Sequence, residues 1–323
     1  SLVVLDELHK YRKWKNFIKG EYDIHEDKLS FLITGSARLN IYRKGGDSLQ
    51  GRYHHYRLHP FSLCELEQKH SSLEAGSPLE LVEDRTSEDT IKALMAFGGF
   101  PEPFLRQSSR THRRWHKERL DRVLREDVRD VSNVSDINSI LLLTDLLKDK
   151  SASLLSVNNL REDLDVSHRA VNNWISVLEN LYFCFQIPPF NSKLSRTLKK
   201  RKKLYLWDWS AISEEGARFE NLIASHLLKF CHRLEDTQGF SAEMWYLRDK
   251  DKRELDFLIT IDRKPWFAVE VKLTQTYSHH LTYFGTRLNI PQLFLVSKKG
   301  KGTFMKNNVF YTSGDTFLRT LGV

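Results

Sequence analysis

Two short, uninterrupted apolar runs constrain the fold of this chain more than any other feature. Leu2–Leu5 and Phe31–Thr34 lack the alternation of polar and apolar residues that marks a strand with one solvated face. Strands of this kind suit a parallel sheet that is covered on both faces. A helix is expected between them over Leu8–Ile18, because apolar residues recur there at helical spacing. The sequence therefore predicts an α/β fold for the N-terminal region.

Composition narrows the class of protein. A length of 323 residues suffices for about two domains, and 40% hydrophobic residues allow a sizeable core. Three scattered cysteines are too few for a disulfide framework or a cysteine-based zinc site, and they fit a reducing cytoplasm. No apolar run approaches the roughly 18 residues of a membrane span, and no signal peptide is visible. We therefore expect a cytoplasmic protein without a membrane partner.

The middle of the chain is predicted to be mostly helical. Residues 67–85 have the polar composition of a linker, and residues 87–131 form helices with a break at Gly98–Pro103. After the break, acidic residues lie three or four positions from basic ones. This part is either a solvated helix held by ion pairs or a face for nucleic acid.

A winged helix is predicted next. Helices at Ile140–Leu147, Val157–Leu164 and His168–Leu181 have the rhythm of a helix-turn-helix, and strands at Tyr182–Ile187 and Lys203–Trp207 would form its wing. Such a module can dock its third helix in the DNA major groove, or it can serve only for packing between domains. Both interpretations stay open at this point.

One segment accounts for nearly all of the net charge of +8. Residues 193–203 contain seven Lys or Arg and no acid, which contributes +7. This run would lie in the wing, where a phosphate backbone would touch first, although such runs are often only solvated loops. The candidate nucleic-acid contacts are Arg169, Asn172 and Asn173 on the third helix, and Lys199, Lys200, Arg201, Lys202 and Lys203 in the wing.

The first strand ends in an acidic pair, Asp6 and Glu7. A nucleotide-hydrolysing site needs such a pair, one acid for the water shell of Mg²⁺ and one to polarise the attacking water. The next strand ends in Thr-Gly-Ser, which brings Ser36 to the same crevice. Further along come Ser-Leu-x-Gly-Arg, ending at Arg52, and Pro-Phe-Ser-x-x-Glu, ending at Glu65.

This series of motifs resembles the AAA+-type ATPases of prokaryotes that carry a C-terminal domain of unknown function. The resemblance implies that Asp6 and Glu7 form a Walker B pair. It also implies that Ser36 is a sensor-1 residue, that Arg52 is an arginine finger or sensor, and that Gly98–Glu102 is a turn of the lid. The implied activity is ATP hydrolysis in a nucleic-acid-linked process, with Mg²⁺ and ATP as cofactors.

No Gly-x-x-x-x-Gly-Lys-[Ser/Thr] loop occurs in the 323 residues, so the phosphate loop expected of this family is absent from them. We therefore expect ATP to bind well only when a missing N-terminal segment supplies that loop. The sheet would also lack a strand, and its exposed edge would be poorly ordered, repacked or paired with a second copy.

A second candidate site lies in residues 210–323. Asp256, followed by Glu270-x-Lys272 on the next strand, resembles the layout of PD-(D/E)xK nucleases. Asp256 and Glu270 could hold Mg²⁺, Lys272 could activate a water, and Glu220 on a helix at Phe219–Cys231 would supply a further acid. The alternative is a non-catalytic relic in which these residues form a buried ion-pair network. The strands of this region are predicted at Glu243–Leu247, Glu254–Ile261, Trp266–Val271 and Leu293–Ser297.

The expected chain is thus α/β with four parts. Residues 1–85 are the later part of an AAA+ P-loop NTPase core with a parallel sheet, 86–135 a helical lid, 136–209 a winged helix, and 210–323 a PD-(D/E)xK restriction-endonuclease-like domain. An ATPase-related protein is the first hypothesis for function. A Mg²⁺-dependent nuclease and a non-enzymatic DNA-binding or interaction protein are the alternatives, and DNA and a second copy of the chain are the candidate partners.

Overall fold

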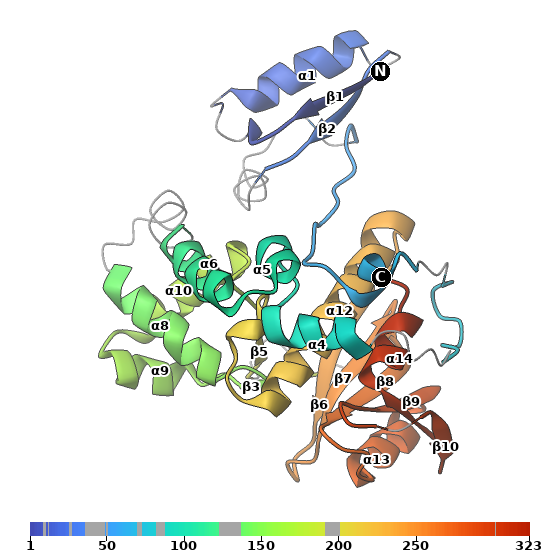
Figure 1. Cartoon of the computed structure of the whole chain (residues 1–323). Coiled ribbons are helices and arrows are strands. Elements are labelled where there is room, and N and C mark those ends of the chain that lie inside the picture. The colour runs from blue at the N-terminus through green and yellow to red at the C-terminus, as the bar shows by residue number, and fades with distance from the viewer. Residues whose placement is uncertain are drawn as a thin grey trace.

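The computed structural model describes residues 1–8, 11, 13–25, 28–35, 49, 51–69, 73–81, 88–122, 137–190, 201–300 and 302–323. It contains an N-terminal β–α–β unit, a helical region and a C-terminal α/β domain (Figure 1). The predicted α/β class is confirmed. Within the described ranges, no helix combines the length and the apolar character that crossing a membrane requires.

The N-terminal unit is a two-stranded parallel sheet with one helix. β1 (Leu2–Leu5) pairs in parallel with β2 (Ser30–Ile33), and α1 (Trp14–His25) connects them. In Figure 1 this unit lies apart from the rest of the molecule, joined to it by an extended segment. The side chains of Leu2 and Val4 are 63% and 57% exposed. The parallel pairing is therefore confirmed, whereas the expected cover on both faces is not present.

α1 begins later than the sequence predicts. Glu7 has a left-handed φ of 51°, which ends the extended segment. The backbone N–H of Tyr11 then donates to the Leu8 carbonyl at 3.0 Å, and that of Trp14 donates to the Tyr11 carbonyl at 3.0 Å. α1 starts at Trp14 and continues to His25, and residues 9, 10 and 12 of the predicted helix lie outside the described residues.

A glycine pair separates two helices at the predicted break. Gly98 has a φ of 76°, and a Cβ built on it would lie 2.8 Å from a carboxylate oxygen of Asp208. Both facts favour glycine at this position. The chain then resumes as a helix at Pro101, whose fixed φ suits the first turn. The helices on either side are α4 (Glu88–Phe97), α5 (Pro101–Arg106) and α6 (Ser109–Arg122).

The three helices and two strands predicted after this point are confirmed. Ser167 caps the third helix, because its hydroxyl accepts the Ala170 N–H at 3.1 Å. The strands form a three-stranded antiparallel sheet in the order β3-β5-β4. The elements are α8 (Ile137–Asp149), β3 (Ser153–Leu154), α9 (Val157–Leu164), α10 (His168–Asn180), β4 (Cys184–Ile187) and β5 (Lys203–Leu206).

The C-terminal domain is a six-stranded mixed sheet in the order β10-β11-β9-β8-β7-β6. α12 and α14 pack on one face and α13 on the other, which gives two separate apolar clusters. The four predicted strands are confirmed, and β10 and β11 are additional. The elements are α12 (Glu215–Gln238), β6 (Ala242–Arg248), β7 (Glu254–Ile261), β8 (Lys264–Lys272), α13 (His279–Leu288), β9 (Gln292–Ser297), β10 (Phe304–Lys306), β11 (Val309–Ser313) and α14 (Gly314–Thr320).

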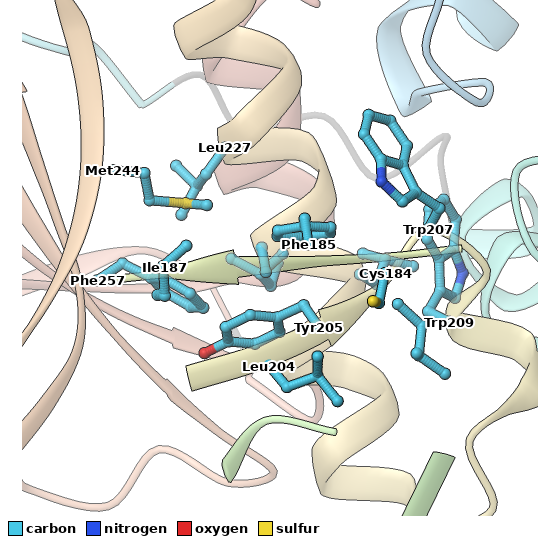
Figure 2. Close-up of a cluster of buried hydrophobic side chains, with 14 of the residues drawn as sticks. Cys184, Phe185, Ile187, Leu204, Tyr205, Trp207, Trp209, Leu227, Met244 and Phe257 are labelled. Atoms are coloured by element: carbon cyan, nitrogen blue, oxygen red, sulfur yellow. The ribbon is translucent and has the colours of Figure 1, made fainter. Parts of the chain in front are cut away.

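The helical region and the C-terminal domain share one core. β5 lies against α12, and Figure 2 shows Phe185 and Tyr205 in the same apolar cluster as Leu227 of that helix. The ring of Tyr205 stacks on Phe185 with centroids 5.5 Å apart and lies 5.7 Å from the ring of Phe257 in β7. All four residues of β5 are buried. The shared core means that the two regions are not independently packed.

The segment that follows the N-terminal unit packs on α12. The backbone N–H and the Nε of Arg57 both donate to Asp236 at 3.0 Å. A short helix, α3 (Leu63–Glu67), begins at a capping box formed by Ser62. The imidazole of His226 joins it to α12, because Nε2 accepts the Leu63 N–H at 3.2 Å while Nδ1 donates to a carbonyl of its own helix at 2.8 Å.

The predicted linker at 67–85 is partly packed structure. Trp266 of β8 donates its indole N–H to the Ser77 carbonyl at 2.8 Å. The side chain of Gln292 bonds both the N–H and the carbonyl of Leu79, at 2.7 and 3.1 Å, and Leu79 is buried. Residues 73–81 are thus held on the C-terminal domain.

The hydrogen bonds of His226 predict a loss of stability in mild acid. Burial lowers the pKa of His226 to about 4, below the usual value near 6.5 of an unfolded chain. The contribution of neutral His226 to the free energy of unfolding is complete above pH 6.5. It falls by about 1.4 kcal/mol per pH unit as the pH drops towards 4. When the free energy of unfolding is measured in urea at several pH values, it should fall less steeply between pH 6.5 and 4 for His226→Gln than for the wild type. The exposed His280→Gln should keep the wild-type slope, and equal slopes in all three proteins would contradict this reading.

Candidate functional site

β1 and β2 end at the same edge of their parallel sheet. Leu5 lies opposite Ile33, so the next residues, Asp6 and Thr34, are neighbours. The Thr34 hydroxyl donates to Asp6 Oδ1, and the backbone N–H of Glu7 donates to the same oxygen at 3.0 Å. These two contacts orient the Asp6 carboxylate at the C-terminal edge of the sheet.

Arg52, also predicted for this site, pairs with a carboxylate of α1. The Nε of Arg52 pairs with Asp23 of α1 at 3.0 Å. Ser36 lies outside the described residues. Thr34, part of the Thr-Gly-Ser motif, is the hydroxyl that meets Asp6, and sequence reasoning missed its role. Its position directly after the second strand was the available signal.

The second candidate site is built on the first turns of α12. Glu214 caps this helix by accepting two backbone N–H groups. Glu220 lies further along, and its Oε1 accepts the Tyr205 hydroxyl of β5 at 2.8 Å. The amide of Asn221 bonds both the N–H and the carbonyl of Leu206 at 2.7 Å. Strand β5 is thereby fixed to α12 beside Glu220.

Lys203, the first residue of β5, reaches carboxylates from α12 and β7. Its Nζ lies 2.8 Å from Glu254 Oε1, 3.1 Å from Asp256 Oδ1 and 3.4 Å from Glu220 Oε1. Only 2% of Lys203 is exposed. This differs from the expectation that Lys203 lies in the exposed basic run, because the strand turns its side chain into the shared core.

Asp256 and Glu270 lie on β7 and β8, which pair as the predicted antiparallel strands. Asp256 Oδ2 accepts the backbone N–H of Val271 at 2.9 Å. Glu270 Oε1 pairs with Lys272 Nζ at 2.7 Å, so these two side chains share one face of β8. Glu270 Oε2 is buried, and it has no hydrogen-bond partner among the described residues.

Burial and like charge set the electrostatics of this cluster. Burial, followed by the charge of Asp256, raises the pKa of Glu220 to about 7 and that of Glu270 to about 8. Burial alone would lower the pKa of Lys203, but Tyr205 and the three carboxylates hold it well above its usual value. Lys203 therefore keeps its charge at neutral pH, while the shifts in pKa favour the protonated forms of Glu220 and Glu270.

The carboxylates in this arrangement do not fit Mg²⁺. Both oxygens of Asp256 already accept N–H donors, and a cation that bridged Glu220 Oε1 and Asp256 Oδ1 would fall at the Lys203 ammonium. Across the described ranges, no three His, Cys, Asp or Glu side chains are grouped as metal ligands. An open pocket of about 330 Å³ does lie between α12 and β8, and its lining includes Glu220 and Lys272.

The candidate nucleic-acid residues are divided between surface and core. Arg169, Asn172 and Asn173 are exposed on α10, as the sequence predicts. Arg201 is exposed and Lys202 is half-buried. Lys203 is buried, as described above, and Lys199 and Lys200 lie outside the described residues.

Three family models match successive parts of the chain. Residues 1–67 match an AAA domain, residues 88–213 a domain of unknown function (DUF8612), and residues 215–313 another domain of unknown function (DUF4143). The AAA and DUF4143 matches together support an AAA-type ATPase-like family.

Two curated relatives are similar to most of the chain. The uncharacterized protein MJ1544 of Methanocaldococcus jannaschii is 24% identical over 287 residues, which cover 85% of this chain and 62% of the relative. The uncharacterized protein MJ1637 of the same organism is 21% identical over an aligned length of 347 residues, gaps included, and the alignment covers 98% of this chain and 70% of the relative. The chain thus spans only part of the length of both relatives. No solved structure matches it.

The position of Lys203 predicts a large stability effect. Lys203→Met should lower the free energy of unfolding by about 3–5 kcal/mol, because it leaves buried carboxylates without their cation. Lys202→Met, at the half-buried neighbouring position, should cost about 1 kcal/mol or less. Denaturant unfolding at pH 7 measures both variants. Equal losses would show that Lys203 contributes no more than a surface lysine.

Proposed function

We propose that this chain is part of an AAA-type ATPase, and that the β1–β2 unit carries the acidic half of its nucleotide-hydrolysis site. The contact between Thr34 and Asp6, at the edge where both strands end, is the observation that carries the proposal. The AAA domain match over residues 1–67 supports it independently. A phosphate loop outside these 323 residues would complete the site in the whole protein.

Each residue of this edge has a distinct role in the proposal. Bound Mg²⁺-ATP would supply the phosphoryl group and the divalent charge. Asp6 would hold a water of the cation's shell, with its carboxylate kept in place by the Thr34 hydroxyl and the Glu7 N–H. The Glu7 carboxylate, two residues beyond the strand, would polarise the attacking water. Thr34 thus acts through Asp6 as a positioning residue.

The proposal assigns nucleic-acid contact to the helical region. Its helices α8, α9 and α10 and its three-stranded sheet have the order of a winged helix. β5 is buried against α12, so this part of the module serves for packing. The polar face of α10 is exposed and carries Arg169, Asn172 and Asn173. The exposed polar face of α10 supports the use in DNA contact, and the burial of β5 supports the use in packing.

The hypothesis of a metal-dependent nuclease has less support than the ATPase proposal. The C-terminal domain brings Glu220 and Asp256 to one ammonium and pairs Glu270 with Lys272, which supports a PD-(D/E)xK-like arrangement. The same contacts occupy the oxygens that a divalent cation would need. We therefore do not extend the proposal to metal-dependent cleavage.

Substitution of Glu7 tests the proposed ATPase role. In the protein that includes a phosphate loop ahead of β1, Glu7→Gln should lower ATP turnover by about 10²-fold or more, because the water loses its base. ATP binding should persist, since binding relies on the phosphate loop. Glu21→Gln, on α1, is the matched control and should keep full turnover. Unchanged turnover in Glu7→Gln would remove the acidic pair from the mechanism.

Salt dependence tests the DNA contact. Affinity for duplex DNA, plotted as log K against log salt, should have a slope of about −0.9 for each phosphate neutralised. Arg169→Ala should make that slope less negative by about 0.9, the value for one phosphate contact. Arg161→Ala, at an exposed position on the neighbouring helix α9, is the control and should leave the slope unchanged. A slope near zero for the wild type would exclude phosphate contact.

A further inference from the structure

The strongest feature outside the proposed nucleotide site is the position of Lys203. It is nine-tenths or more buried, and its single ammonium contacts three carboxylates from two different elements. An ammonium has three N–H donors and no acceptor, so three carboxylate oxygens match its bonding capacity. Glu254 also pairs with Arg248, and Glu220 also accepts the Tyr205 hydroxyl.

We propose that Lys203 is the resident cation of this carboxylate cluster, and that its ammonium takes the place in which a cluster of this composition would hold a divalent metal. The bridging position between Glu220 and Asp256 belongs to its Nζ. The second oxygen of Asp256 is held by a backbone N–H from β8. The cluster is therefore a fixed ionic joint between β5 and the C-terminal domain, closed to divalent cations.

An independent observation concerns Glu270 on the neighbouring strand. One of its oxygens pairs with Lys272, while the other is buried without a partner in the part of the chain that the structure describes. An unpartnered buried oxygen beside Asp256 is a ready ligand once a cation can approach. The chain therefore holds latent metal ligands, and Lys203 decides whether they can be used.

The experiment removes the internal cation and measures metal binding directly. Mn²⁺ is titrated into the wild type, Lys203→Met, Lys203→Met/Asp256→Asn and the control Lys202→Met, and bound metal is followed by electron paramagnetic resonance. Lys203→Met should gain one Mn²⁺ site per chain, with a Kd of about 100 μM or tighter. The double variant should lose that site. Lys202→Met should behave as the wild type.

Thermal unfolding gives a second readout of the same exchange. A metal that binds only the folded chain stabilises it by mass action. Mn²⁺ at millimolar concentration should raise the Tm of Lys203→Met by several degrees, and it should leave the Tm of the wild type and of Lys202→Met unchanged. A folded Lys203→Met protein that gains neither the site nor the stabilisation would overturn the proposal.

Mn²⁺ binding to the wild type tests whether the cluster is closed to divalent cations, even if Lys203→Met fails to fold. Wild type and Asp256→Asn should bind Mn²⁺ identically, because the cluster is closed in both. A wild-type site that Asp256→Asn abolishes would overturn the proposal. Dependence on Asp256 also separates this outcome from metal bound at Asp6, so failure here leaves the proposed ATPase function untouched.

Discussion

The burial of β5 is the constraint on which the rest of the structure depends. Four consecutive residues with no exposed face require cover on both sides, and α12 and the strands around it supply that cover. β3 pairs with β5 only at Lys203 and Leu204. On the edge of β5 that faces β3, the backbone N–H and carbonyl of Leu206 would therefore lack partners. Asn221 of α12 supplies them with its amide, and Ser151 bonds the same amide oxygen at 2.7 Å. Removing this helix would therefore leave both apolar surface and backbone groups of β5 unsatisfied.

α12 is also where the N-terminal part of the chain attaches. Arg57 pairs with Asp236 near the C-terminal end of the helix, while Glu220 and Asn221 lie near its start. Between these two ends of the helix, Lys229 donates to the carbonyl of Pro60 at 3.1 Å and so holds the segment that packs on α12. One rigid helix thus links the residues that follow the AAA-like unit to the buried lysine cluster.

The sequence predicted the elements well wherever periodicity alone determines them. β7 and α9 have the predicted bounds, and Asp256, Glu270, Lys272 and Glu220 were identified as one group. The predicted start of α1 was wrong, because the backbone of Tyr11 and of Trp14 forms hydrogen bonds to the residue three positions earlier, which the hydrophobic pattern does not record. The β10–β11 hairpin was missed although Asn307 and Asn308, both at positive φ, are typical turn residues.

Lys203 shows why the residues of a site can be predicted while the environment of one of them is predicted wrongly. Its six basic neighbours in residues 193–202 place it by composition in an exposed run, and only its place at the start of a buried strand distinguishes it. Burial, and after it the charge of Asp256, raises the pKa of Glu220 and of Glu270 even with Lys203 and Lys272 present. Removing a further positive charge must then be compensated by a proton, a metal ion or separation of the strands. The helical region therefore contributes charge as well as apolar surface to the C-terminal domain, and neither region completes its core without the other.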